Sequence, residues 1–125
     1  MSRIQLSSYI NFQGRAREAM EFYHQILGGK LDLQAGPGQR VSQARLEVDG
    51  VTLIGSDGHP DYPATVGENM ALSLQGTDAG RLTKVFQALA EGGKTQMPLS
   101  KQPWGGTVGW LKDRFGIGWT VSINA

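Results

Sequence analysis

The sequence predicts an α+β fold built from two βαβββ repeats, and two observations carry this prediction. The first is a pair of amphipathic helical segments, each followed by the tripeptide Gly-Gly-Lys, at residues 28–30 and 92–94. The second is a match between the flanking segments, NFQG (11–14) with SLQG (73–76) and VDGVTLI (48–54) with RFGIGWT (114–120). Two such halves are expected to form a strongly curved mixed sheet, with the helices on its convex side and a concave cleft between the halves.

The helices are indicated by apolar residues at helical spacing. In the first helix these are Ala16, Ala19, Met20, Tyr23, Ile26 and Leu27. In the second, which follows an N-cap at Thr77 or Asp78, they are Leu82, Val85, Phe86, Leu89 and Ala90. Both helices are expected to end at the glycine pairs, because glycine is favoured where a helix stops. The offset between the halves grows from 62 residues (11 to 73) to 64 (28 to 92), which predicts two extra residues in the second helix.

Alternation along the first strand of each half assigns its side chains to two faces. The helix side is expected to receive Leu6, Ser8, Ile10 and Phe12 in the first half, and Met70, Leu72 and Leu74 in the second. The cleft side is expected to receive Ser7, Tyr9 and Asn11 in the first half, and Asn69, Ala71 and Ser73 in the second.

The later strands follow the same rule. In SQARLEV (42–48), Arg45 and Glu47 are expected to point into the cleft. The dipeptide Asp49-Gly50 after this segment predicts a hairpin turn. In the last strand of each half, Ile54 and its mate Thr120 face the cleft, whereas Trp119, Val121 and Ile123 are expected to face the core.

The chain has 125 residues, a length that suits one compact domain. Residues 1–125 are therefore assigned to a single domain. Residues 1–56 form its first half, residues 57–68 a linker loop, and residues 69–125 its second half.

Composition narrows the classes of partner. The net charge is +1 with acidic and basic residues interspersed, which argues against a nucleic-acid or membrane-surface partner. There is no cysteine, so disulfides and thiolate chemistry are excluded. The N-terminal segment lacks the apolar run of a signal peptide, and no stretch is long enough to span a membrane. A cytoplasmic protein with a small-molecule or protein partner is expected.

Three longer segments carry a family resemblance: YINFQGRAREAMEFYHQILGGK, LIGSDG and PWGGTVGWLKDRFGIGW. Their order and spacing resemble the vicinal oxygen chelate superfamily of glyoxalase I, bleomycin-resistance proteins and extradiol dioxygenases. They are most similar to its PhnB-like branch, often labelled demethylubiquinone methyltransferase-like. The resemblance covers nearly the whole chain. It implies a cleft protein that acts as an enzyme or as a small-molecule binder, and commonly as a homodimer.

In enzymes of this superfamily, the resemblance implies a divalent metal held by His, Glu or Gln from the first and last strands of each half. The matching positions here are Ser7, Ile54, Asn69 and Thr120. None supplies an imidazole or a carboxylate, the groups that bind transition metals well. A shift of one residue in the first strands would bring in Ser8 or Met70, with the same result. The sequence therefore predicts no metal site and no cofactor.

The label of methyltransferase finds no support in the sequence. A Rossmann-like methyltransferase needs a glycine-rich turn between a strand and a helix, whereas GPGQRV (36–41) precedes an expected strand. If the chain has acid or base chemistry, the candidates are Glu47 and His59, because a histidine titrates near neutral pH. A turn residue is the plainer interpretation of His59, and a surface ion pair is an equal alternative for Arg45 and Glu47.

The leading hypothesis is a metal-independent small-molecule binding protein, similar to the drug-sequestering members of the superfamily. Aromatic side chains would stack on the ligand. The candidates are Trp104 and Trp110, which flank the segment GGTVG. The full set of expected ligand-binding residues is Ser7, Tyr9, Asn11, Arg45, Glu47, Asn69, Ser73, Trp104, Trp110 and Thr120. The alternative is an isomerase, lyase or dioxygenase relative. A third interpretation is a structural dimer whose cleft has no function.

Overall fold

The computed structural model describes residues 6–36, 38, 40–59, 61 and 63–124. The chain divides into two compact units, Met1–Thr65 and Val66–Ala125. The boundary between them falls inside the predicted linker, residues 57–68.

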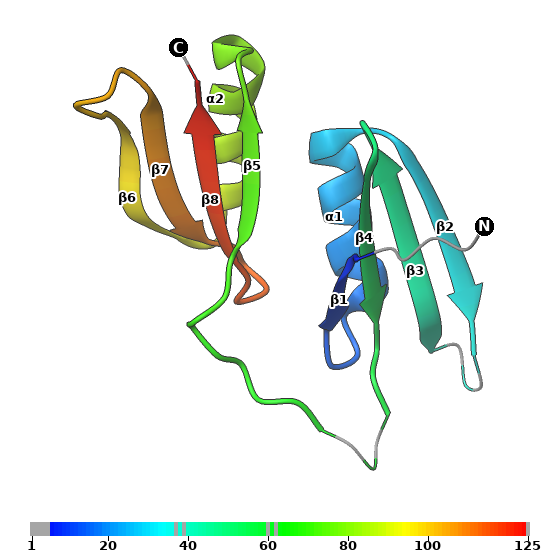
Figure 1. Ribbon diagram of the computed structural model, residues 1–125. Helices are drawn as coiled ribbons and strands as arrows, with labels where there is room; N and C mark the ends of the chain where they lie inside the picture. The colour runs from blue at the N-terminus through cyan, green and yellow to red at the C-terminus, as the bar shows by residue number, and fades with distance from the viewer. Residues whose placement is uncertain (1–5, 37, 39, 60, 62, 125) are drawn as a thin grey trace. The chain divides into compact units, whose positions relative to one another are not determined.

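Unit 1 has the order strand, helix, strand, strand, strand. Its elements are β1 (Ser8–Asn11), α1 (Ala16–Leu27), β2 (Lys30–Ala35), β3 (Val41–Val48) and β4 (Val51–Ser56). The strands lie in the order β1-β4-β3-β2. The pair β1 and β4 is parallel, and the other pairs are antiparallel. Helix α1 packs on β2, β3 and β4, so one face of the sheet is covered by the helix (Figure 1).

Unit 2 repeats this order. Its elements are β5 (Leu72–Gly76), α2 (Ala79–Ala90), β6 (Lys94–Lys101), β7 (Thr107–Lys112) and β8 (Gly118–Ile123). The strand order is β5-β8-β7-β6, with β5 and β8 parallel. Helix α2 packs on β6, β7 and β8 (Figure 1). The predicted α+β fold of two βαβββ repeats is therefore confirmed, while a cleft between the halves stays a prediction.

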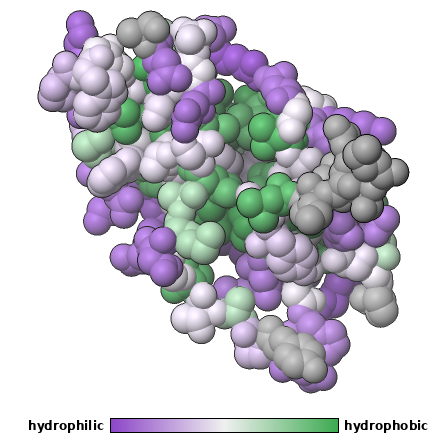
Figure 2. Space-filling view, viewed as in Figure 1, coloured by the Kyte–Doolittle hydropathy of each residue, from purple (hydrophilic) through white to green (hydrophobic). Residues whose placement is uncertain are grey.

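Each unit has its own apolar core between the helix and the sheet. In unit 1 the buried residues are Phe12, Ala16, Ala19, Met20, Tyr23, Val41, Ala44, Leu46 and Leu53. In unit 2 they are Val85, Phe86, Leu89, Leu111, Trp119 and Val121. The prediction that Trp119 lies in the core is confirmed. Both hydrophobic and hydrophilic residues reach the surface shown in Figure 2.

Two predicted core positions are wrong. Leu6 is 100% exposed and Met70 is 83% exposed. Strands β1 and β5 begin only at Ser8 and Leu72, so these two residues precede the strands, where alternation does not hold their side chains against a helix.

The helices begin and end close to where the sequence predicts. Asp78 is the N-cap of α2, and its carboxylate accepts a hydrogen bond from the backbone N–H of Arg81. Both helices contain 12 residues, so the predicted lengthening of the second helix is wrong. The two extra residues lie at the two ends of the helix instead. Residues 77–78 separate Gly76 from α2, whereas Arg15 alone separates Gly14 from α1, and Glu91 stands between α2 and Gly92, whereas Gly28 follows α1 directly.

The hairpin between β3 and β4 follows the sequence signal. Asp49 and Gly50 have φ values of 50° and 78°, as a two-residue type I′ turn requires. Gly28 caps α1 as predicted, and the paired glycines after each helix have a second role. A Cβ atom on Gly29 would overlap the backbone carbonyl of Glu47, and one on Gly93 would overlap that of Lys112. The repeated Gly-Gly-Lys therefore marks a close backbone approach in both units.

Buried aspartates brace the two units. In unit 1, Asp57 accepts hydrogen bonds from the backbone N–H groups of Ala16 (2.8 Å) and Val41 (2.7 Å). It thereby ties the start of α1 to the start of β3. Arg40 donates to the backbone oxygens of Asp57 and Gly58, at 3.1 and 2.8 Å. The first residues of the predicted linker are thus part of the hydrogen-bonded structure of unit 1.

In unit 2, Asp113 is 3% exposed and lies in the connection between β7 and β8. Its Oδ1 accepts hydrogen bonds from the backbone N–H groups of Phe115 (2.8 Å) and Ile117 (3.0 Å). Its Oδ2 accepts one from the indole Nε1 of Trp119, at 2.9 Å. One carboxylate thus fixes a five-residue connection (113–117) and the core tryptophan together.

Candidate functional site

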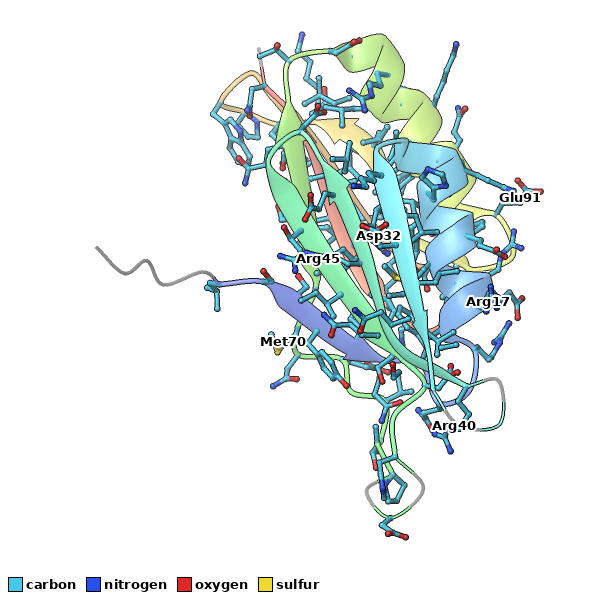
Figure 3. The ribbon with its side chains drawn as sticks, turned by 90° about the vertical axis from the view of Figure 1, so that its right-hand side faces the viewer. Arg17, Asp32, Arg40, Arg45, Met70 and Glu91 are labelled. Atoms are coloured by element: carbon cyan, nitrogen blue, oxygen red, sulfur yellow. The ribbon has the colours of Figure 1, made fainter. Side chains whose placement is uncertain are left out.

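The face of the unit 1 sheet that lies away from α1 is called the first open face here. One row across it joins β1, β4, β3 and β2, through Tyr9, Ile54, Arg45 and Asp32. The next residue of β4, Gly55, points toward the helix, because a Cβ on it would lie 2.7 Å from Phe12 Cε2. Ile54 therefore faces outward, as the sequence predicts. Arg45 lies on the side of the sheet away from α1, the helix that carries Arg17 (Figure 3).

Arg45 and Glu47 are two residues apart on β3, and both lie on this face. The Nε atom of Arg45 is 2.9 Å from Oε1 of Glu47, and their side chains are 39% and 53% exposed. This Nε atom is nevertheless buried and has no acceptor in hydrogen-bond geometry within the described chain. We read the contact as an ion pair in which the Nε–H group does not point at the carboxylate, because distance alone does not make a hydrogen bond.

Tyr9 is 63% exposed, although it is the second residue of a strand. Asn11 ends the same strand, and its Oδ1 accepts a hydrogen bond from the backbone N–H of Gln13 at 2.8 Å. Asn11 thus holds the turn that leads into α1 and has a structural role. Ser7 precedes β1 and is partly buried.

The two candidates for acid or base chemistry are not brought together. Glu47 pairs with Thr52 near the start of β4, and His59 lies beyond the end of that strand at Ser56. Ser56 lies four residue steps beyond Thr52 along the strand, a length of about 13 Å. His59 is exposed, and its Nδ1 accepts a hydrogen bond from the backbone N–H of Asp61 at 3.1 Å. This contact is that of a turn residue.

The second open face lies on the side of the unit 2 sheet away from α2. One row across it joins β5, β8, β7 and β6, through Ser73, Thr120, Trp110 and Met97. Trp110 faces outward because Gly109 beside it points at the helix, where a Cβ would lie 2.7 Å from Phe86 Cε2. Its side chain remains 49% exposed in the middle of a strand.

The other predicted residues of unit 2 lie at the ends of strands. Trp104 is 74% exposed in the connection between β6 and β7, where its indole lies against Gly106. Asn69 is exposed and precedes β5. The structure therefore places Ser73, Trp110 and Thr120 side by side and leaves Trp104 and Asn69 outside that row.

The positions that the resemblance assigns to metal ligands do not fit a metal ion. Ile54 has no donor atom, and the others offer only neutral hydroxyl or amide groups, Ser7, Asn69 and Thr120. The strand register adds their direct neighbours, Tyr9 beside Ile54 and Ser73 beside Thr120. These supply no imidazole or carboxylate either. Within the described part of the chain, no group of three or more His, Cys, Asp or Glu residues is arranged to hold a metal.

Comparison with known proteins identifies the family. A family model described as 3-demethylubiquinone-9 3-methyltransferase matches residues 5–122. The chain belongs to this family. Among solved structures, protein PA1353 from Pseudomonas aeruginosa has 36% sequence identity and a TM-score of 0.89, over 98% of each chain. The relationship therefore extends over both units.

Two further solved structures share the fold. A PhnB protein from Bacillus cereus has 24% identity and a TM-score of 0.81, over 97% of this chain and 100% of its own. A glyoxalase/bleomycin resistance protein from Albidiferax ferrireducens T118 has 18% identity and a TM-score of 0.70, over 96% of this chain and 98% of its own. The expected place in the vicinal oxygen chelate superfamily, in its PhnB-like branch, is confirmed.

Asp32 and Met97 lie in the two rows across the open faces but were not among the predicted site residues. A signal for Asp32 is present, because Leu31 and Leu33 alternate with polar residues along β2. For Met97 the signal is broken, since β6 shifts its register on both sides of this residue.

Among the described helices, none is long and apolar enough to cross a membrane.

Proposed function

We propose that this chain binds a small molecule on the open faces of its sheets and does so without a metal ion. The observation that carries the proposal is the exposed aromatic ring in the row across each open face, Tyr9 in unit 1 and Trp110 in unit 2. The uncovered face of an antiparallel sheet normally carries polar residues. A ring that stays exposed there is available for stacking on a planar ligand.

The neighbours of Trp110 suit a ligand with both apolar and polar parts. Thr120 pairs with Trp110 on one side and supplies a hydroxyl group, and Met97 pairs with it on the other side and supplies a thioether. A methionine side chain adapts to ligands of different shape. No bond-breaking step is proposed, since Glu47 and His59 lie at opposite ends of β4.

A methyl transfer reaction is not part of the proposal, although the family model carries that description. Strand β2 ends at Ala35 and β3 begins at Val41, so the glycine-containing segment between them joins two antiparallel strands. A glycine-rich cofactor loop of the Rossmann type instead leads from a strand into a helix, where the helix N-terminus receives the phosphates.

Binding can be tested through the tryptophans. A panel of planar aromatic compounds is screened by thermal shift, and the affinity of each hit is measured for the parent, Trp110→Ala and Trp110→Phe. Loss of the stacking ring is expected to weaken binding about fivefold, because a stacking pair contributes about 1 kcal/mol. Trp110→Phe keeps a ring and should remain within about twofold of the parent. Unchanged affinity of Trp110→Ala for every hit would place the binding surface elsewhere.

Metal independence is a second prediction. Protein purified without an affinity tag is expected to contain well below one transition metal per chain by elemental analysis, because the ligand-type positions lack imidazole and carboxylate groups. Added chelator should leave the affinity for the aromatic hits unchanged. Stoichiometric zinc, nickel, manganese or iron that survives dialysis would instead favour the enzyme interpretation.

We also propose that the chain forms a homodimer. Strands β1, β2, β5 and β6 are sheet edges within their units, and exposed edges tend to pair with other chains. Large apolar side chains, Leu6 and Met70, are exposed just before two of these edges. Light scattering is expected to give about twice the chain mass of 13.5 kDa. A monomer that persists at high protein concentration would contradict the proposal.

A further inference from the structure

The first open face carries the guanidinium group of Arg45, which does not form hydrogen bonds that stabilise the fold. Arg40 and Arg114 donate hydrogen bonds to backbone oxygens and so brace the units. The side chain of Arg45 makes no hydrogen bond with the described residues, and among them it forms an ion pair with Glu47. A guanidinium group has five N–H donors, which form their best bonds with a carboxylate in a two-pronged arrangement. Arg45 therefore retains donor capacity that its neighbours leave unmet.

The partner of Arg45 is easily displaced. Glu47 is 53% exposed on its side chain, and an exposed ion pair of this kind contributes little to folding stability. The Nε–H group of Arg45 is not directed at Glu47, so the pair lacks the hydrogen bond that would hold it in one geometry. The Nε atom of Arg45 is buried, but its side chain is 39% exposed, so a second carboxylate can approach the terminal NH₂ groups of the guanidinium.

The residues beside Arg45 indicate which kind of molecule would carry such a carboxylate. Ile54 is its direct neighbour on β4, and Tyr9 is the neighbour of Ile54 on β1. Adjacent strands lie about 4.8 Å apart, so the row from Arg45 to Tyr9 spans about 10 Å. Ile54 offers an apolar floor in the middle, and Tyr9 offers an exposed ring at the end. The row matches the length of a one-ring or two-ring aromatic carboxylate.

We infer that the first open face binds planar aromatic carboxylates, with Arg45 receiving the carboxylate in place of Glu47 and the aromatic ring lying over Ile54 toward Tyr9. This inference rests on the proposed small-molecule function and names the class of ligand. Asp32 and Glu47 flank Arg45, and Lys30 pairs with Glu47 on β2. The face is therefore electrically balanced, and Glu47 acts as an internal counter-ion that competes with the ligand.

The experiment uses three probes that share one ring system and differ in charge: 2-naphthoate, the neutral 2-naphthamide and the cationic 2-naphthylmethylamine. Their dissociation constants are measured by calorimetry with the full chain and with Arg45→Gln and Glu47→Gln. The parent is expected to bind naphthoate about tenfold more tightly than naphthamide, the size of a charge-assisted hydrogen bond. Arg45→Gln should remove this preference, and Glu47→Gln should raise naphthoate affinity several-fold by removing the competitor.

Matched controls separate the local contact from net charge. Arg17→Gln and Glu21→Gln change the charge of the chain by the same amounts, but both residues lie exposed on α1. They are expected to leave all three affinities unchanged. Tyr9→Ala should weaken naphthoate and naphthamide equally, about fivefold, because it removes the ring contact alone. Unfolding curves of the variants at Tyr9, Arg17, Glu21 and Glu47 should match the parent, since these side chains are exposed. The curve of Arg45→Gln shows whether that variant is folded under the conditions of the binding measurement.

Each outcome bears on the inference. Equal binding of naphthoate and naphthamide would overturn it and leave the proposed function intact. Preference for the cationic probe, lost in Glu47→Gln, would show that Glu47 and not Arg45 selects the ligand, and would also overturn it. If none of the three probes binds, the inference fails, and the Trp110 screen decides separately whether the proposed function fails with it.

Discussion

Replacing Asp113 by alanine is expected to lower the free energy of unfolding by about 3 kcal/mol, because a buried acceptor of three hydrogen bonds is removed. Three N–H groups lose this acceptor at once: those of Phe115, Ile117 and the indole of Trp119. Asp113 is 3% exposed, so water does not easily replace the carboxylate. Urea unfolding followed by tryptophan fluorescence measures the loss as a lower midpoint.

Asp113→Asn is the matched control. The amide keeps one acceptor oxygen and replaces the other with an NH₂ group, which cannot accept a hydrogen bond. Either Trp119 or the two backbone N–H groups must then face a donor. The free energy of unfolding of Asp113→Asn should therefore lie between those of the parent and Asp113→Ala. If Asp113→Ala unfolds at the same urea concentration as the parent, the carboxylate does not hold this connection, and the account of unit 2 is wrong.

The stability of this connection also matters for the second open face. It joins β7 to β8, and these strands bring Trp110 and Thr120 together as direct partners. A loosened connection would let the two strands shift against each other. Since a shift of one residue turns every side chain to the opposite face, the exposed tryptophan depends on the buried aspartate.

Much of the fold could be predicted because the sequence repeats itself. The helical spacing and the glycine stops appear twice, so each half served as a test of the other. The alternation around Ile54 and Thr120 correctly predicted that both side chains point away from the helix. Each lies beside residues that turn toward a helix, such as Leu53 and Trp119. Strand starts were harder. Nothing in the local pattern distinguishes Leu6 and Met70 from strand residues, because hydrogen bonding to a neighbouring strand decides where a strand begins.

The candidate site was less predictable, because contacts across the sheet depend on register. Glu47 and His59 are only 12 positions apart in sequence, yet antiparallel pairing of β3 and β4 sends them to opposite ends of the hairpin. The roles of Asp57 and Asp113 also escaped prediction. Their carboxylates bind backbone groups, and backbone donors carry no signature in the identity of the residue that supplies them.

Replacing Gly29 by alanine is expected to cost about 3 to 4 kcal/mol of unfolding free energy, through two separate effects. Its φ of 85° lies in the left-handed region, where a Cβ atom is strained. The added Cβ would also meet the backbone carbonyl of Glu47 and would lie 2.7 Å from the Cβ of Val48. A backbone carbonyl in the middle of a sheet cannot move aside without disturbing the pairing of β2 with β3.

Gly28→Ala separates the two effects. Gly28 also has a positive φ, 77°, but a Cβ on it would meet nothing within 4 Å. It should therefore show the conformational strain alone, about 1 to 3 kcal/mol, because its ψ of −152° places it in a region that is essentially restricted to glycine. The difference between the two variants measures the steric contact with β3. If urea midpoints show that Gly29→Ala is no less stable than Gly28→Ala, the close approach at Glu47 is absent. The strand that carries Arg45 and Glu47 would then have to be placed differently against β2.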